Sequence, residues 1–221
     1  MKEKARRRIF GKLQRTPKWK NEEFDEVEYE PTSVKDLLTE MKDISELIID
    51  LAYSAVLFDS DDIGEEVKFL EVRMDKLNYE IRMTAMLAAR TKEDAEQLAG
   101  ILQVAEAAES ISDAAGDIVL LLSLKEKTRP VLPKLLSKAD EQLFRTRVST
   151  TSNACTKHIG DLSIESETGM RIIAIRRGDC WIYNPQADTT LQADDWLIVR
   201  GTYEGFKELE EFLQGKVEVL E

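Results

Sequence analysis

The spacing of apolar residues changes once along this chain, near residue 143. Before that point, apolar side chains recur every three or four residues, which is the period of an amphipathic helix. After it, short β-branched and aliphatic runs alternate with turn residues, as expected for strands. A run of helices followed by a run of strands indicates two domains, one helical and one α+β, rather than one interleaved α/β unit.

Two helices are expected first. Ser33 is a candidate cap, with Asp36 three residues later, and apolar residues then recur at helical spacing as far as Ala55. Residues 59–64 interrupt the pattern. A second helix is expected from Val67 to Ala88. Its apolar residues recur at alternating steps of three and four residues, which is typical of helices packed side by side.

A third helix is expected to open at a capping box formed by Thr91 and Asp94 and to extend to about Leu124. Pro130 and Pro133 then mark a break, and we expect a short helix through Leu143. These residues complete the helical half.

The second half has a different pattern. We expect one helix in it, over 203–213, because its apolar residues follow the helical period. Residues 147–151 are β-branched, and four further runs predict strands: 170–177, 180–183, 196–200 and a closing strand over 216–220. A unit of this size buries little apolar surface by itself, so pairing of two copies is expected.

Charge is distributed unevenly. The net charge is −12, but residues 1–20 hold nine Lys or Arg and one Glu, so the remainder carries −20. We interpret residues 1–30 as a charged arm, for which a solvated tail and a contact with an anionic membrane surface are the two alternatives. An acidic body repels phosphate, so nucleic-acid binding is not expected.

Acidic residues recur on two of the predicted helices. Residues 43–50 align weakly with residues 106–113, and each copy places acids on one helix face. Like charges four residues apart repel each other by about 0.2–0.5 kcal/mol per pair. Three alternatives remain open: a solvated face, a basic group of another chain, or a hard cation such as Mg, Ca, Mn or Fe.

Several motifs are missing from the chain. There is no Gly-x-Gly-x-x-Gly, so no NAD site is expected, and no P-loop, nucleophile elbow or His-Glu-x-x-His. Cys155, Cys180 and the single His158 form neither a disulfide framework nor a zinc motif. No apolar segment is long enough for a signal peptide or membrane span. We therefore predict a cytoplasmic protein that is not an enzyme and has no catalytic residues.

The stretch Glu109-Ser-Ile-Ser-Asp113-Ala-Ala-Gly-Asp117-Ile118 resembles a segment of PhoU-like proteins. This resemblance covers residues 31–143 and implies an antiparallel helical bundle. Some PhoU-like proteins bind metal through paired Glu-x-x-x-Asp motifs, and the matching positions are Glu46, Asp50, Glu109 and Asp113. The pattern differs at Ser110, where Arg is usual, and at Asp117, where Asn is usual.

Residues 144–221 resemble the TrkA C-terminal domain, also called the second half of an RCK module. The matching segments follow in order: His158 to Leu162, Thr168 to Met170, Ile172 to Arg177, Pro185, Asp188 to Gln192 and Asp195 to Val199. One departure is Asp194, where Gly is usual. Because the turn there favours a left-handed backbone, we expect Asp194 to adopt it.

The TrkA-C resemblance implies a small α+β domain that pairs and binds a small anionic ligand, a cyclic dinucleotide in several relatives. The positions that match the ligand site are Ile173, Arg176, Arg177, Asn184 and Pro185. Arginine forks suit phosphate. The alternative is that Arg176 and Arg177 merely pair with acids of this acidic protein.

The two resemblances together predict a regulatory protein of potassium or other cation transport, whose partners are a second copy and a membrane channel or transporter. A metal-binding regulator of phosphate signalling is the first alternative. A purely structural dimerisation protein is the second.

Overall fold

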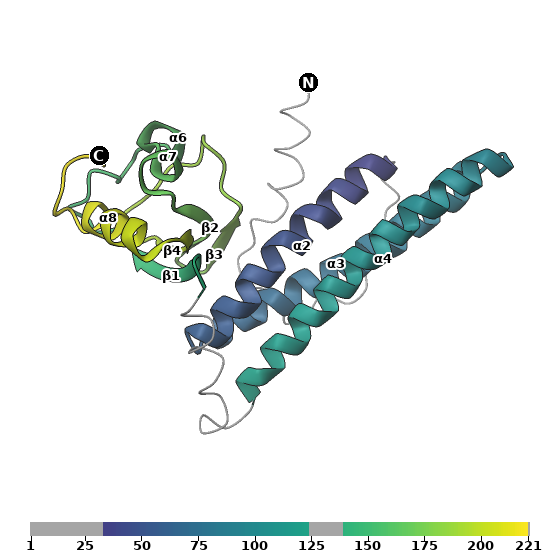
Figure 1. The fold of residues 1–221 in the computed structure, drawn as a ribbon, viewed down its shortest axis with the longest axis horizontal. Helices are drawn as coiled ribbons and strands as arrows, with labels where there is room; N and C mark the ends of the chain where they lie inside the picture. The colour runs from purple at the N-terminus through teal and green to yellow at the C-terminus, as the bar shows by residue number, and fades with distance from the viewer. Residues whose placement is uncertain (1–32, 124–138, 221) are drawn as a thin grey trace. The chain divides into compact units, whose positions relative to one another are not determined.

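The computed structural model describes residues 33–123 and 139–220, which form two compact units. The first unit is helical and the second contains a sheet (Figure 1). Within the described residues, no helix is both long and apolar enough to span a membrane. Each unit is described by itself below.

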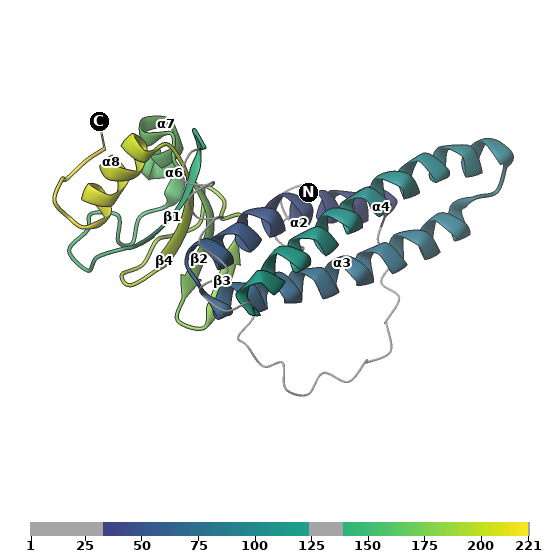
Figure 2. The same cartoon turned by 60° about the horizontal axis from the view of Figure 1, so that its bottom comes forward.

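The first unit is a bundle of three long helices, α2 (Val34–Leu57), α3 (Asp61–Ala88) and α4 (Lys92–Leu120), and α4 ends in a short 3-10 turn, η1 (Leu121–Ser123). Each helix packs against the other two (Figures 1 and 2). The predicted caps are confirmed, because the Ser33 hydroxyl accepts the Asp36 N–H at 3.2 Å and Thr91 and Asp94 form a reciprocal capping box. Local hydrogen bonds therefore set where these helices begin.

The second helix begins earlier than the sequence pattern predicted. Ser60 caps it and α3 runs from Asp61, so Gly64 lies inside a helix rather than in a break. The reason is a close approach of helices: a Cβ at Gly64 would lie 2.9 Å from Leu122 Cδ1 and 3.1 Å from Val119 Cγ1. Glycine here marks tight packing rather than a turn.

The bundle core follows the predicted seams. It is built mostly from aliphatic and methionine side chains, the largest of which are Leu37, Met41, Ile44, Ile48, Leu51, Leu70, Met74, Leu77 and Ile81. One ion pair lies at its edge, where Arg73 of α3 contacts Glu40 of α2 with N–O distances of 2.7 and 2.8 Å. Glu40 is buried, and its pairing with Arg73 satisfies a charge that would otherwise be costly there.

The second unit contains a four-stranded antiparallel sheet in the order β1-β4-β2-β3. Its elements are β1 (Gln142–Arg147), α6 (Ile159–Leu162), α7 (Ile164–Thr168), β2 (Arg171–Arg177), β3 (Cys180–Tyr183), β4 (Trp196–Gly201) and α8 (Tyr203–Leu213). The predicted strands at 170–177, 180–183 and 196–200 and the helix at 203–213 are confirmed to within one residue.

Helices α7 and α8 share one hydrophobic core with the sheet. Ile164 of α7 and Leu209 of α8 cluster with Ile175 of β2 and with Leu197 and Val199 of β4. Because successive side chains of a strand point to opposite faces, the alternate residues lie on the other face of the sheet. The unit is thus a two-layer α+β domain, as predicted.

Two local predictions in this unit are wrong. Gln142 and Leu143 belong to β1 instead of ending a helix, because they pair with Gly201 and Arg200 of β4. The segment 148–151 is a loop and turn, in which Val148 and Ser149 donate to Asp195 and Leu213. Residues 216–219 form bends instead of a strand, after a turn that ends at Gly215 with φ +72°. At Gln142 and Leu143, pairing across the sheet overrides local propensity.

Candidate ligand and metal sites

Strands β2 and β3 bring two of the predicted ligand residues together. The Asn184 N–H donates to the Ile173 carbonyl at 2.9 Å, and Pro185 follows directly. A bulge in β2 falls at Ile173, between Ile172 and Ala174, and bulges often redirect side chains beside binding sites. Asn184 has φ 42°, a left-handed conformation that asparagine tolerates, and its Oδ1 accepts from Arg171 Nη2 at 3.2 Å.

Arg176 and Arg177 lie on opposite faces of the sheet. Arg176 is aligned with Trp181 of β3 and Trp196 of β4, on the face away from α8, and its Nε donates to the Gly178 carbonyl at 3.2 Å. Arg177 is the last residue of β2, opposite Cys180. Of these two arginines, Arg176 is therefore the one that shares a face of the sheet with Trp196, which is 39% exposed, and with the buried Trp181.

Arg177 is held inside the unit by Asp195. Two of its guanidinium nitrogens donate to the two oxygens of Asp195 at 2.8 Å each, and Nη2 also donates to the Thr190 carbonyl at 2.7 Å. Asp195 is fully buried and accepts the Gln192 N–H as well. The hydrogen bond to Asp195 raises the pKa of Arg177. This geometry favours the alternative in which Arg177 pairs with an acid, and its contact with a ligand stays a prediction.

A row of arginine and tryptophan crosses the whole sheet, and the sequence did not reveal it. Arg147, Trp196, Arg176 and Trp181 lie opposite one another on β1, β4, β2 and β3. The guanidinium carbons of Arg145 and Arg147 lie 5.2 and 5.8 Å from the Trp196 ring centroid, which are cation–π distances. The alternating arginines of residues 145–147 were a visible signal, but the strand register that aligns them with Trp196 was not.

The predicted left-handed turn is confirmed. Asp194 has φ 71°, and its Oδ1 accepts from Arg147 Nη2 at 2.8 Å. The turn places Asp194 against β1 while the next residue, Asp195, points inward to Arg177. Two adjacent acids thus anchor two arginines of different strands.

The four predicted metal ligands lie on two helices. Glu46 of α2 is exposed and pairs with Lys42 at 2.7 Å, Asp50 and Glu109 are half-buried, and Asp113 is exposed. Among residues 33–123 and 139–220, no group of three or more His, Cys, Asp or Glu is arranged to hold a metal ion. A metal at these four residues stays a prediction.

Helix α3 contributes acids that the sequence repeat did not include. Burial, followed by the charges of Asp113, Asp75 and Asp117, raises the pKa of Glu71. Burial and the charge of Asp113 raise the pKa of Asp75. A Cβ at Gly116 would lie 2.7 Å from Glu71 Oε2, so this glycine leaves room for the carboxylate against α4. The structure therefore groups Asp113 with acids of α3.

Cys155 and His158 have other partners. The Cys155 Sγ lies 3.1 Å from the Ser149 carbonyl, and burial with the charges of Asp195 and Asp194 raises the pKa of its thiol. The His158 Nδ1 lies 2.9 Å from the Asp188 carbonyl. A raised thiol pKa disfavours the thiolate that nucleophilic catalysis needs.

Comparison with known families assigns both units. The PhoU domain family matches residues 38–122, and the TrkA-C domain family matches residues 143–214. The chain is a PhoU domain followed by a TrkA-C domain. Both are regulatory, non-catalytic families. None of the curated proteins compared with the chain matches it.

Several solved structures show partial similarity. The RCK_C domain dimer of S. agalactiae BusR in complex with c-di-AMP is 20% identical over 35% of this chain and 96% of that chain, with a TM-score of 0.33. The GsuK channel bound to NAD is 24% identical over 57% of this chain and 21% of that one, with a TM-score of 0.31. S. agalactiae BusR with its busAB-promotor DNA is 14% identical over 84% and 98%, with a TM-score of 0.32. TM-scores this low support no inference about this chain, so the assignment of its two domains depends on the family matches.

Proposed function

We propose that the protein senses a small phosphate-bearing ligand through its TrkA-C domain and regulates potassium or other cation transport. The TrkA-C match at residues 143–214 carries this proposal. Its predicted ligand positions support it, because Ile173 and Asn184 are hydrogen-bonded to each other and Pro185 adjoins them. Arg176 lies on the same strand as Ile173, three residues further along.

The sheet face away from α8 has suitable chemistry for such a ligand beside Trp196. Guanidinium forks bind phosphate through paired hydrogen bonds, and Arg176 supplies one beside Trp196, which is 39% exposed. Indole rings stack on nucleobases. Because a unit of this size buries little surface, we propose that two copies pair and that the ligand lies in the groove between them.

Regulation requires that the ligand favour one of two arrangements of the protein. We propose that the PhoU bundle docks on a membrane cation channel or transporter, which recognises one arrangement. By linkage, the transporter then changes the affinity for the ligand by the same factor as the ligand changes the affinity for the transporter. A gene for a membrane cation transporter adjacent to this one would support this partner.

Calorimetry on the full chain tests the ligand site. We titrate c-di-AMP first, because the TrkA-C resemblance implies a cyclic dinucleotide, and then ATP and inorganic phosphate. Loss of a charge-assisted contact in Arg176→Ala is expected to weaken binding about 10- to 100-fold. Lys207→Ala on α8 is the matched control and is expected to bind like the wild type.

Two results would count against the proposal. Unchanged affinity in Arg176→Ala would rule out Arg176 as a ligand contact. If none of the three phosphate compounds binds the wild-type chain, phosphate sensing itself would be rejected. A stable dimer with neither ligand nor metal would instead favour the purely structural dimerisation protein.

A metal-binding regulator of phosphate signalling is the second candidate. The mutual repulsion of Glu71, Asp75, Asp113 and Asp117 favours it, since a cation would relieve it. Elemental analysis of purified wild type would find stoichiometric metal, which the double variant Asp50→Ala/Asp113→Ala would lack. Wild type without metal would reject this candidate.

A further inference from the structure

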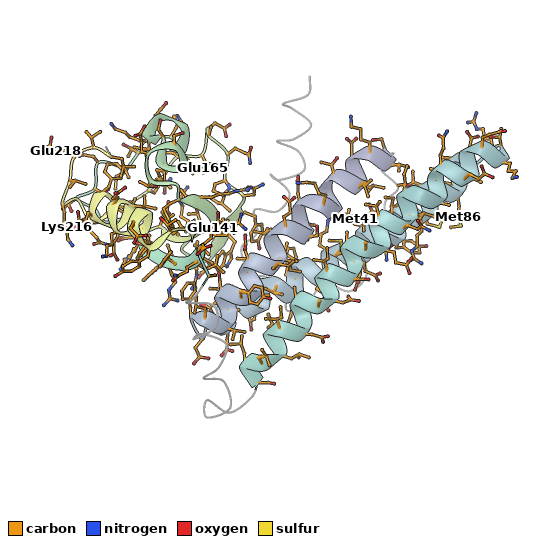
Figure 3. All side chains as sticks on the ribbon, viewed as in Figure 1. Met41, Met86, Glu141, Glu165, Lys216 and Glu218 are labelled. Carbon is orange, nitrogen blue, oxygen red and sulfur yellow. The ribbon has the colours of Figure 1, made fainter. Side chains whose placement is uncertain are left out.

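Helix α3 carries apolar side chains on the face opposite its buried seam. Val72, Tyr79, Met83 and Met86 are 53%, 61%, 39% and 64% exposed. Met86 lies toward the turn between α3 and α4 (Figure 3). We call these four residues the α3 stripe. Exposed apolar surface that is contiguous along one helix face usually marks a contact with another molecule.

The α3 stripe has the spacing of a two-helix seam. Together with Lys76, which falls between Val72 and Tyr79, its positions advance by alternating steps of four and three residues. The aliphatic stem of Lys76 can cover apolar surface while its ammonium reaches water. The pattern therefore fits one further helix that lies along α3.

We propose that this helix is α3 of a second copy, packed antiparallel about a two-fold axis between Leu77 and Asn78. In this register Val72 lies against the partner's Met83, and Lys76 lies over the partner's Tyr79. Each contact occurs twice, as a two-fold axis requires. A Lys ammonium over a Tyr ring adds a cation–π contact.

Charge complementarity supports this register. Beside the stripe, Asp75 meets the partner's Arg82, and at its ends Glu65 meets the partner's Arg90. All four of these residues are exposed on α3 or just beyond it. The neighbouring Asp113 already repels Asp75, so an arginine from a second copy would stabilise that carboxylate.

A parallel pairing in register would be less favourable. It would place Lys76 against the partner's Lys76 and Asp75 beside the partner's Glu80, two like-charge contacts. In the antiparallel arrangement, Asp75 instead faces the partner's Arg82, and Lys76 lies over the partner's Tyr79. It involves the PhoU bundle alone and is independent of the ligand proposal.

Electron-spin distance measurements on the full chain test the geometry. Cys155 and Cys180 are replaced by Ser, and one spin label is placed at Lys68 or at Ala89, outside the central contact. From the helix rise and an interaxial distance of about 9 Å, the antiparallel register predicts label separations of about 30 Å at Lys68 and about 36 Å at Ala89. A parallel pairing predicts about 10 Å at both positions.

Charge reversal tests the contacts. Arg82→Glu places two acids against each other twice, and we expect about tenfold weaker self-association through α3. The double variant Asp75→Arg/Arg82→Glu exchanges the two charges and is expected to restore it. Lys92→Glu, off the stripe, is the control and should have no effect.

The outcomes separate this interface from any pairing of TrkA-C domains. Distances that fit α3 pairing, lost in Arg82→Glu and recovered in the double variant, would support the proposal. A monomer, or a dimer with other distances, would overturn it, as would a double variant no better than Arg82→Glu. Neither result depends on whether a phosphate ligand binds.

Discussion

Arg176 and Arg177 are neighbours in the chain, but their side chains face opposite sides of the sheet. Two guanidinium nitrogens of Arg177 donate to the buried Asp195, whereas Arg176 is aligned with Trp181 and the exposed Trp196 on the other face. One residue along a strand thus separates a structural arginine from a candidate ligand arginine. The two should respond differently to the same substitution.

Arg177→Ala is expected to lower the free energy of unfolding by about 3–5 kcal/mol, because it leaves the Asp195 carboxylate buried without its cation. Arg176→Ala is expected to change it by less than about 1 kcal/mol. Urea unfolding of both variants measures the difference. Equal losses in the two would contradict the structural role of Arg177.

At the scale of single elements, capping and packing act together. The Thr91–Asp94 box begins α4, and two hydrogen bonds between these residues satisfy N–H groups that the helix leaves open. Further along α4, Gly116 lets Glu71 approach from α3. The first effect is local, and the second depends on how two helices meet.

Thr91→Ala is expected to cost about 1 kcal/mol, because α4 loses its capping hydroxyl. Faster hydrogen exchange in the first turn of α4, together with a lower midpoint in urea, would show this loss. Lys92→Ala, which removes an exposed neighbour, serves as control and should shift the midpoint less. An unchanged first turn in Thr91→Ala would contradict the capping role.

The raised pKa of Glu71 predicts a pH dependence. A carboxylate with a raised pKa in the folded state stabilises the fold at low pH, and this contribution is lost as pH rises through the folded-state pKa. Lowering the pH from neutral to below the ordinary pKa of 4.5 should therefore strengthen the bundle through Glu71. The charges of Asp113, Asp75 and Asp117 contribute to the raised pKa of Glu71, whereas the charge of Lys68 lowers this pKa.

Glu71→Gln isolates this contribution. The variant should be more stable than the wild type at neutral pH, and the difference should shrink as the pH falls below the ordinary pKa of 4.5. Urea unfolding at a series of pH values measures both. A constant difference across the range would show that Glu71 ionisation does not oppose folding.

At the scale of the whole molecule, the two units have separate cores. The bundle core is formed by α2, α3 and α4, and the other by the sheet with α7 and α8. Damage to one core should therefore leave the structure of the other intact. This separation suits a regulator in which one domain binds a ligand and the other docks.

Leu70→Ala tests this independence, because Leu70 is fully buried in the bundle. The cavity should cost about 2–5 kcal/mol and raise hydrogen exchange in α2, α3 and α4. Exchange in β2 and β4 should stay as in the wild type. Parallel loss of protection in the sheet would show that the two units fold as one.

Much of the fold follows from local features of the sequence. The apolar periods of α3 and α8 and the caps at Ser33 and Thr91 predicted those helices, and the aliphatic run over 171–177 predicted β2. Predictions failed where contacts with a residue far away in the chain determine the secondary structure. Leu143, for example, lies in a strand because it pairs with Arg200. Ligand and metal residues were placed by resemblance and stay predictions.

The sequence by itself determined the order of a helical and an α+β domain, the caps of α2 and α4 and the positions of β2, β3 and β4, because periodicity and capping depend on residues a few positions apart. Only the tertiary structure decided that Asp195 holds Arg177, that Glu71 meets Asp113, and that Arg147, Trp196, Arg176 and Trp181 form one row. These groupings join residues distant in the chain, and strand register and helix packing, which set them, arise only when the whole domain folds.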